Sequence, residues 1–242
     1  MKLQNETKRR QRSYEDGCAF AQALDLVGER WALLVMRELM FGPRRFTDLR
    51  ESLTGIATNV LTQRLAGLER AGVVQQVDLP RPARGRAYAL TPWGLAFREP
   101  LRVMGAWAAR SPHLRFDHPL SAAAAMLSLG SMFDPTRAGG AKLSLDLRLP
   151  DGDFALRVEG GQLSVEPGRN AWPEVIVTCD QNALLRVLYA GTPVEAALAD
   201  GSLVVEGDVR ALTRLATMFQ SPEPMTPVQQ PGPIASLREE PS

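Results

Sequence analysis

The sequence predicts an α+β fold in two parts, each with its own core. The chain has 242 residues, enough for one large domain or two ordinary ones. Apolar residues in the first half recur at helical spacing, whereas short alternating runs separated by glycine-containing turns dominate after residue 142. Residues 1–110 carry 18 Lys and Arg against 11 Asp and Glu, and the remainder carries 10 against 16. A basic half followed by an acidic half indicates nucleic-acid contact at one end only.

The first part is expected to begin with four helices. Glycine ends or separates them, at Gly28, at Gly42 before Pro43, and at Gly55, which supplies a turn. The helices are expected over Cys18 to Val27, Trp31 to Met40, Thr47 to Leu53, and residues 57–71.

The helix over 57–71 has two different faces. Leu61, Leu65 and Leu68 fall on one stripe, which should anchor the helix to a core. The opposite face carries Asn59, Thr62, Gln63 and Ala66. Asn and Gln suit adenine edges, and Thr can bond to a base or touch a thymine methyl, so this face is a candidate reader of DNA. The alternative is the ordinary solvated side of an amphipathic helix.

Arginines bracket this uncharged helix, which favours the DNA interpretation because phosphates flank a groove. Two precede the third helix, and three lie in a Pro- and Gly-containing loop between strand-like runs at Val73 to Leu79 and Ala87 to Leu90. Helix, turn, helix and basic hairpin in this order are typical of a winged helix-turn-helix. The candidate DNA-binding residues are Arg44, Arg45, Thr47, Thr58, Asn59, Thr62, Gln63, Arg64, Arg81, Arg84 and Arg86.

A longer helix should follow the hairpin. Thr91 before Pro92 is a start signal, and Pro100 inside the run is expected to kink the helix. The apolar residues of this helix and of the first helix exceed what a domain of about ninety residues covers easily by itself. Trp31 and Trp93 are expected in the core, and Met104 and Trp107 at an interface. The full apolar set is Phe20, Leu24, Phe97, Leu101, Met104 and Trp107.

The second part reads as a curved antiparallel sheet covered by helices. Turn signals at Asp151-Gly152, Gly160-Gly161 and Pro167-Gly168 separate the first four strands. Strands are expected over Lys142 to Leu149, Phe154 to Val158, Gln162 to Glu166, Val175 to Cys179 and Leu203 to Glu206. Helices are expected over Ser121 to Phe133, Gln181 to Tyr189, Pro193 to Asp200 and Asp208 to Phe219.

From Cys18 to about Arg110 the chain resembles the HxlR-type winged-helix regulators, relatives of the MarR group. The resemblance is carried by long ordered motifs, at residues 23–31, 39–46, 61–65, 68–74 and 88–94. It implies a homodimeric transcription regulator in which the first helix and the helix after the wing form the dimer. Each subunit would read one half of an inverted-repeat operator in double-stranded DNA.

Cys18 is a redox candidate by the same resemblance, because some HxlR-type regulators use a cysteine at the corresponding place as an oxidation sensor. A reactive thiol needs exposure and a lowered pKa, and Glu15 and Asp16 would oppose thiolate formation. A buried cysteine at the start of a helix is therefore expected.

Residues 121–220 resemble the sterol carrier protein family, most clearly at 178–180, 190–201 and 203–208. Proteins of that family enclose an apolar tunnel for lipids, so the resemblance implies a small apolar effector. The alternative is that the same side chains close the core without a void. The candidate ligand-binding residues are Leu184, Leu188, Leu198, Leu215, Met218 and Phe219.

Several classes of function are not expected. No run approaches the roughly 18 apolar residues of a membrane span and no leader is recognised, so a cytoplasmic protein is predicted. Two cysteines and two histidines offer no metal site, and no cofactor motif or catalytic set is found, so an enzyme is not expected. The alternative to a regulator is a lipid-binding or protein-interaction protein whose winged helix does not read DNA.

The expected organisation has five segments. They are a flexible basic arm (1–13), a winged helix-turn-helix with its dimerisation helices (14–112), a connector (113–120), a sterol-carrier-like domain (121–220) and a disordered tail (221–242).

Overall fold

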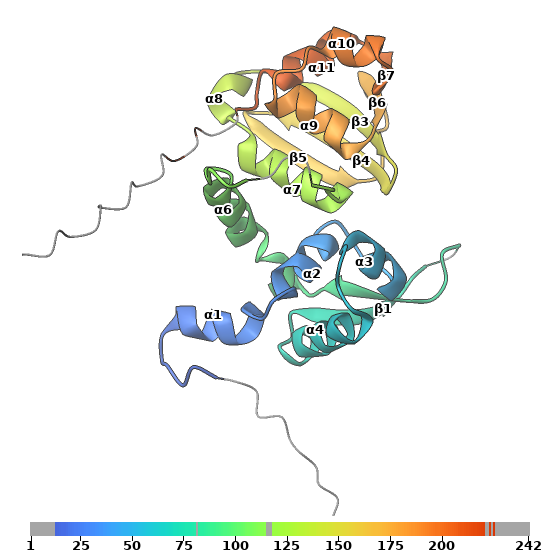
Figure 1. Cartoon of the computed structure of the whole chain (residues 1–242). Helices are drawn as coiled ribbons and strands as arrows, with labels where there is room; N and C mark the ends of the chain where they lie inside the picture. Colours follow the sequence, from blue (N-terminus) through green and yellow to red (C-terminus); the bar gives the residue numbers. More distant parts are fainter. Residues whose placement is uncertain (1–12, 81, 115–117, 221–222, 224, 226–242) are drawn as a thin grey trace, which may run out of the picture.

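The computed structural model describes residues 13–80, 82–114, 118–220, 223 and 225 (Figure 1). The basic arm up to residue 12, Arg81, part of the connector and nearly all of the tail lie outside these residues. Two separate clusters of buried apolar side chains form, one from Val27 to Leu101 and one from Ala122 to Phe219. The two-part α+β fold predicted from the sequence is confirmed.

The N-terminal part is a winged helix-turn-helix. Its elements are α1 (Ala19–Val27), α2 (Ala32–Leu39), α3 (Phe46–Ser52), α4 (Thr58–Arg70), β1 (Val74–Asp78), β2 (Arg86–Leu90), α5 (Pro92–Leu95) and α6 (Arg98–Ala108). Val35 of α2, Leu49 of α3 and Leu61 of α4 are fully buried in one apolar cluster, so the three helices share this core. Gly55 takes the positive φ of 88° that the turn between α3 and α4 needs.

The strands β1 and β2 form the wing. They pair antiparallel, from Val74 opposite Leu90 to Asp78 opposite Arg86. Arg44 adds a short bridge to this hairpin, since its backbone N–H donates to the Tyr88 carbonyl at 2.9 Å and its carbonyl accepts from the Tyr88 N–H at 2.8 Å. The segment that enters α3 is thereby fixed to the wing.

The helix after the wing differs from the prediction of one helix kinked at Pro100. The chain instead forms α5, with the Thr91 side chain accepting from the Gly94 N–H at 3.1 Å, and then starts again at Arg98. Pro100 therefore lies in the first turn of α6, where a missing N–H breaks no helical hydrogen bond.

Trp93 is 56% exposed, which contradicts its predicted place in the core. The single turn of α5 turns Gly94 inward, so close to β1 that a Cβ there would lie 2.2 Å from the Val73 carbonyl oxygen. No room is left on that side for an indole, and the adjacent residue faces outward. Trp31 is partly buried and packs against the core. Leu101 and Phe97 also pack there, leaving Met104 and Trp107 exposed.

The C-terminal part contains a five-stranded sheet with helices packed against it. Its elements are α7 (Ala122–Met132), α8 (Pro135–Ala138), β3 (Leu143–Leu149), β4 (Gly152–Glu159), β5 (Gln162–Pro167), β6 (Val175–Cys179), α9 (Gln181–Tyr189), α10 (Val194–Ala199), β7 (Leu203–Gly207) and α11 (Val209–Ala216). The strand order is β5-β4-β3-β6-β7. The predicted antiparallel sheet is observed in three of its four strand pairs, and β3 and β6 pair in parallel.

The two parts meet where α2 and α6 contact α7 (Figure 1). Glu38 of α2, 1% exposed, accepts hydrogen bonds from the Ser121 hydroxyl before α7 (2.8 Å) and from Arg37 (2.9 Å). The rings of Phe41 and Phe154 lie edge to face, with centroids 5.6 Å apart. No helix among the described residues is long and apolar enough to cross a bilayer.

Candidate nucleic-acid interface

The outer face of α4 is exposed and uncharged. Asn59, Thr62 and Gln63 are exposed, whereas Leu61, Leu65 and Leu68 on the opposite stripe are buried. The Thr62 hydroxyl donates to the carbonyl of Thr58, one turn earlier, at 2.9 Å. The side-chain amides of Asn59 and Gln63 have no hydrogen bond within the part of the chain that the structure describes. Their donors and acceptors are therefore available to an external partner such as a base edge.

The Arg64 side chain is held by an ion pair within the protein. Its Nη2 lies 3.1 Å from Glu29 Oε2, its side chain is only 20% exposed, and its Nε is buried without a partner among the described residues. Glu29 lies between α1 and α2, so the ion pair ties α4 to that corner. This pair could not be predicted from local sequence patterns because its members are 35 positions apart.

Arg84 and Arg86 carry free charge on the wing. Both side chains are exposed, and neither guanidinium group forms a hydrogen bond or ion pair with any residue described. The turn that carries them is closed by a hydrogen bond from the Leu79 N–H to the Gly85 carbonyl at 2.9 Å, and Gly85 has a φ of 122°. These two guanidinium groups can therefore reach a phosphate backbone, while the place of Arg81 lies outside the described residues.

Arg45 points at the wing. Its Nη2 donates to the carbonyl oxygen of Ala83 and to that of Arg84, the second at 2.8 Å. Its backbone N–H donates to Asp48 Oδ2 at 3.2 Å at the start of α3. Thr47, two positions after Arg45, is exposed, and its hydroxyl donates to Asp48 Oδ1 at 3.1 Å.

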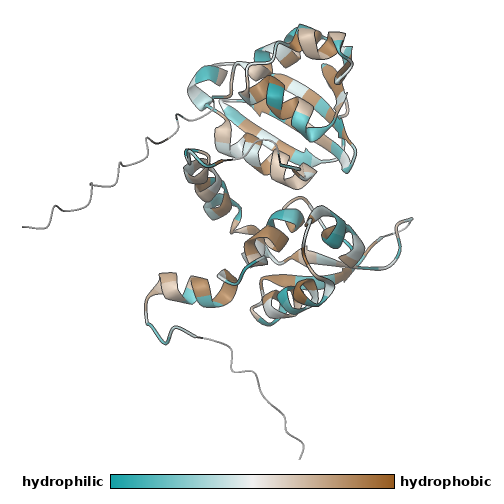
Figure 2. Ribbon diagram, in the orientation of Figure 1, coloured by the Kyte–Doolittle hydropathy of each residue, from teal (hydrophilic) through white to brown (hydrophobic). Residues whose placement is uncertain are grey.

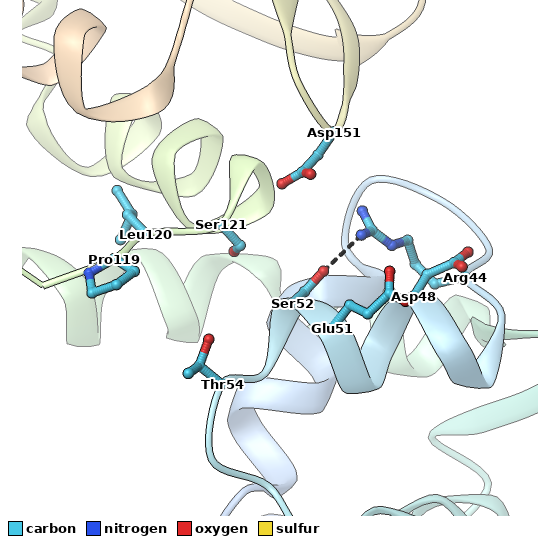
Figure 3. Close-up of a pocket in the computed structure, with 9 residues that line it drawn as sticks. All are labelled: Arg44, Asp48, Glu51, Ser52, Thr54, Pro119, Leu120, Ser121 and Asp151. Carbon is cyan, nitrogen blue, oxygen red and sulfur yellow. Dashed lines mark hydrogen bonds between the residues drawn. The ribbon is translucent and has the colours of Figure 1, made fainter.

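Arg44 points away from the wing, as neighbouring residues of an extended segment do. Its Nη2 donates to the Ser52 hydroxyl at 2.8 Å, inside a pocket of about 460 Å³ between α3 and the C-terminal part (Figure 3). The pocket is lined by Arg44, Asp48, Glu51, Ser52, Thr54, Pro119, Leu120, Ser121 and Asp151. Five of the arginines predicted to bind DNA lie among the described residues, and the structure divides them into two groups. Arg84 and Arg86 are free, whereas Arg44, Arg45 and Arg64 bind other parts of the chain.

Comparison with known proteins agrees with this geometry. The HxlR-like helix-turn-helix family matches residues 26–114. The transcriptional regulator YodB of Bacillus subtilis is 36% identical over 86 residues, which are 36% of this chain and 77% of YodB. YvaP of the same organism, an uncharacterized HTH-type transcriptional regulator, is 33% identical over 89 residues, which are 37% of this chain and 82% of YvaP. The chain belongs to the HxlR-like helix-turn-helix family.

The C-terminal part of this HxlR-like chain matches a different family. Residues 120–231 match the alkyl sulfatase C-terminal family. The solved sec-alkylsulfatase Pisa1 from Pseudomonas sp. is 22% identical, with a TM-score of 0.39, and the match covers 41% of this chain and 16% of that enzyme. The solved reduced form of YodB is 33% identical, with a TM-score of 0.36, and covers 40% of this chain and 95% of YodB. The resemblance to sterol carrier proteins stays a prediction.

The residues expected to bind an apolar ligand lie in the C-terminal core. Leu184, Leu188, Leu215, Met218 and Phe219 are buried, and Leu198 is partly buried against them. They line neither the pocket of Figure 3 nor a second pocket of about 310 Å³ beside α6 and α7. Among the described residues no group of three or more His, Cys, Asp or Glu side chains could hold a metal ion.

The prediction that Cys18 is buried is wrong, because its thiol is exposed. Cys18 precedes the first turn of α1, a helix whose buried residues are only Ala21 and Val27. No amide reaches full hydrogen-bond geometry with the sulfur, yet the free N–H groups of Ala21 and Phe20 favour the thiolate and lower the pKa of Cys18. Loss of solvent around the thiol acts in the opposite direction on the pKa and is the smaller contribution.

Proposed function

We propose that this HxlR-like chain is a sequence-specific, DNA-binding transcription regulator. In this proposal α4 enters the major groove and the wing contacts the adjacent backbone. The observation that carries it is the exposed face of Asn59, Thr62 and Gln63, in which the Asn59 and Gln63 amides are free among the described residues, beside a wing with two unpaired arginine side chains. An uncharged face able to hydrogen bond and flanked by cations matches the pattern of base edges between phosphates.

The residues divide into two roles in this proposal. Asn59, Thr62 and Gln63 contact base edges, and Arg84 and Arg86 contact phosphates. Thr58 and Thr47 lie at the exposed starts of α4 and α3, where hydroxyls and free N–H groups suit phosphate oxygens. Arg81 is proposed for the backbone from its place in the wing sequence alone. For Arg44 and Arg64 a phosphate contact would require the Ser52 and Glu29 contacts to open.

The regulator is proposed to act as a homodimer on an inverted repeat, with residues 14–112 as the DNA-binding and dimerisation unit. Phe20 of α1 is 72% exposed, and Met104 and Trp107 of α6 are 48% and 79% exposed. Exposed large apolar side chains on two helices of one unit support an interface between copies. A two-fold dimer places two α4 helices on half-sites about one helical turn apart.

The role of residues 121–220 is proposed to be regulatory rather than catalytic. The curated relatives named above are called transcriptional regulators, and the match to the alkylsulfatase covers 16% of that enzyme. An apolar effector would have to enter the packed core at Leu184 and Leu188, so a contribution to the dimer is the simpler role. A lipid-binding or protein-interaction protein that ignores DNA is the alternative that the next experiment separates.

The test is selection of bound sequences from random DNA duplexes by the purified full chain. An enriched inverted repeat is expected, with half-sites about ten base pairs apart. Gln63→Ala should relax the preference at one position in each half-site, at a cost of about 1 to 3 kcal/mol, while leaving the other positions unchanged. Failure to enrich any sequence, together with no binding to mixed duplexes at low salt, would refute the proposal.

A further inference from the structure

Arg45 connects two elements of the DNA-binding unit. Its backbone is fixed at the base of the wing, because Arg44 pairs with Tyr88 on β2 and Asp48 accepts from the Arg45 N–H. Its side chain then reaches the tip of the wing, where Nη2 donates to the carbonyl oxygens of Ala83 and Arg84. The guanidinium group therefore links the start of α3 to the tip of the wing.

The tip has little else to hold it. From residue 82 to residue 86 every side chain is exposed, so no apolar anchor contributes there. The hydrogen bond from Leu79 to the Gly85 carbonyl closes the base of the turn and leaves the carbonyls of Ala83 and Arg84 beyond it. A loop with few buried contacts opens at low free-energy cost unless other bonds hold it.

We infer that Arg45 is a positioning residue that braces the wing and so sets where Arg84 and Arg86 meet the DNA backbone. The planar fork of an arginine presents several N–H donors in a fixed geometry, which suits two neighbouring carbonyls. A lysine at this position keeps the charge but has a single flexible ammonium group. The brace exists without DNA, and only its effect on binding rests on the proposed function.

This role differs from a direct phosphate contact in its energetics. A phosphate ligand adds its own electrostatic contribution, so its removal weakens binding whether or not the other wing arginines are present. A brace acts through Arg84 and Arg86 by removing the ordering cost that a free wing pays on binding. Its removal therefore costs affinity only while those two arginines remain.

Hydrogen exchange in the free protein tests the brace itself. In Arg45→Ala and in Arg45→Lys, the Leu79 amide should exchange about tenfold faster, because two hydrogen bonds that restrain the turn are lost or weakened. The Val73 amide, which donates to the Leu68 carbonyl at 3.0 Å at the end of α4, should be unchanged and so report an intact fold. Arg50→Ala is the matched control, since it removes an exposed arginine of α3 whose side chain forms no hydrogen bond or ion pair with a described residue.

A double-mutant cycle on a mixed-sequence duplex at low salt tests the function of the brace. Arg45→Ala and Arg45→Lys should each weaken binding about tenfold in the otherwise unchanged chain, and less than about twofold when Arg84→Ala and Arg86→Ala are already present. Unchanged Leu79 exchange would overturn the inference. Equal losses of affinity in both backgrounds, or full affinity in Arg45→Lys, would also overturn it and assign Arg45 to a phosphate. If the unchanged chain binds no duplex, the proposed function fails, and the Leu79 exchange still decides whether the brace exists.

Discussion

Cys18 and Cys179 lie in opposite surroundings. Cys18 is exposed, and backbone N–H groups at the start of α1 lower its pKa. Cys179 is buried at the end of β6, where loss of solvent, with a smaller contribution from Asp180, raises its pKa to about 12. Because the thiolate is the reactive form, Cys18 combines access with ionisation and Cys179 lacks both.

Alkylation with iodoacetamide near neutral pH should therefore label Cys18 alone. The rate should rise with pH through a midpoint below that of a cysteine in an unstructured peptide, since a lowered pKa leaves more thiolate at any pH below it. Mass spectrometry of the peptides measures both sites, and Cys18→Ser should abolish labelling until the protein is denatured. A midpoint at or above the peptide value, or equal labelling of Cys179 in the native state, would contradict this account.

The partners of charged residues mark the limit of prediction at this scale. The exposed face of α4 followed from the 3.6-residue period, which is local to the sequence. The side-chain contacts of Arg64 with Glu29 and of Arg45 with Ala83 join residues 35 and 38 positions apart. No local sequence pattern predicts contacts between residues so far apart in the chain. The prediction for Cys18 failed for a different reason: it considered the charges of Glu15 and Asp16, whereas the backbone amides of the helix start lower the pKa.

Gly67 and Gly94, both in helices of the winged helix-turn-helix, differ in how much space a side chain would have. Gly67 lies inside α4, where an added Cβ would meet nothing closer than Arg70 Nη2 at 4.0 Å. Gly94 lies in α5, where a Cβ would lie 2.2 Å from the Val73 carbonyl oxygen and 3.0 Å from Leu90 Cδ2. Only the second glycine is required by packing.

Gly67→Ala should stabilise the protein by about 0.5 to 1 kcal/mol, because alanine restricts the unfolded chain and favours a helix interior. Gly94→Ala should destabilise it by about 3 kcal/mol, since the Val73 carbonyl, just before β1, belongs to the backbone and the helix must move. Urea unfolding measures both substitutions, each serving as control for the other. Equal effects would show that α5 does not pack on β1 as described.

The elements themselves were predictable, and their pairing was less so. Apolar periodicity and turn residues located the helices and strands to within a few residues, as for β6 at Val175–Cys179 and α9 at Gln181–Tyr189. The parallel pairing of β3 with β6 was not predicted. The sequence between them indicates two more strands and a loop, but it does not indicate which strand β6 pairs with or in which direction. Pro100 shows a related limit of prediction. A proline kinks a helix that has already begun but fits the first turn of a new one, so its effect depends on where the preceding helix ends.

At the scale of the whole molecule, the two parts share a small contact region. Glu38 meets Ser121, Phe41 meets Phe154, and the Ser131 hydroxyl donates to the Arg102 carbonyl at 3.1 Å. These contacts join α2, α6 and the residues next to them to α7 and β4, and they leave Met104 and Trp107 of α6 exposed. Figure 2 shows hydrophobic colouring along α1, which extends away from the rest of the N-terminal part. The uncovered surface is therefore on the helices that the homodimer proposal requires.

Trp107 is the largest exposed side chain of this surface, at 79% exposure, so it is expected to dominate the contact between copies. Trp107→Glu buries a charge at both ends of a two-fold interface and should raise the dimer dissociation constant at least about 30-fold. Sedimentation velocity over a range of concentrations measures it. Trp172→Glu is the control for a charge placed at an exposed tryptophan outside α1 and α6, because Trp172 is 89% exposed between β5 and β6, and it should weaken the dimer less. Equal weakening by both, or an unchanged dimer in Trp107→Glu, would place the interface elsewhere.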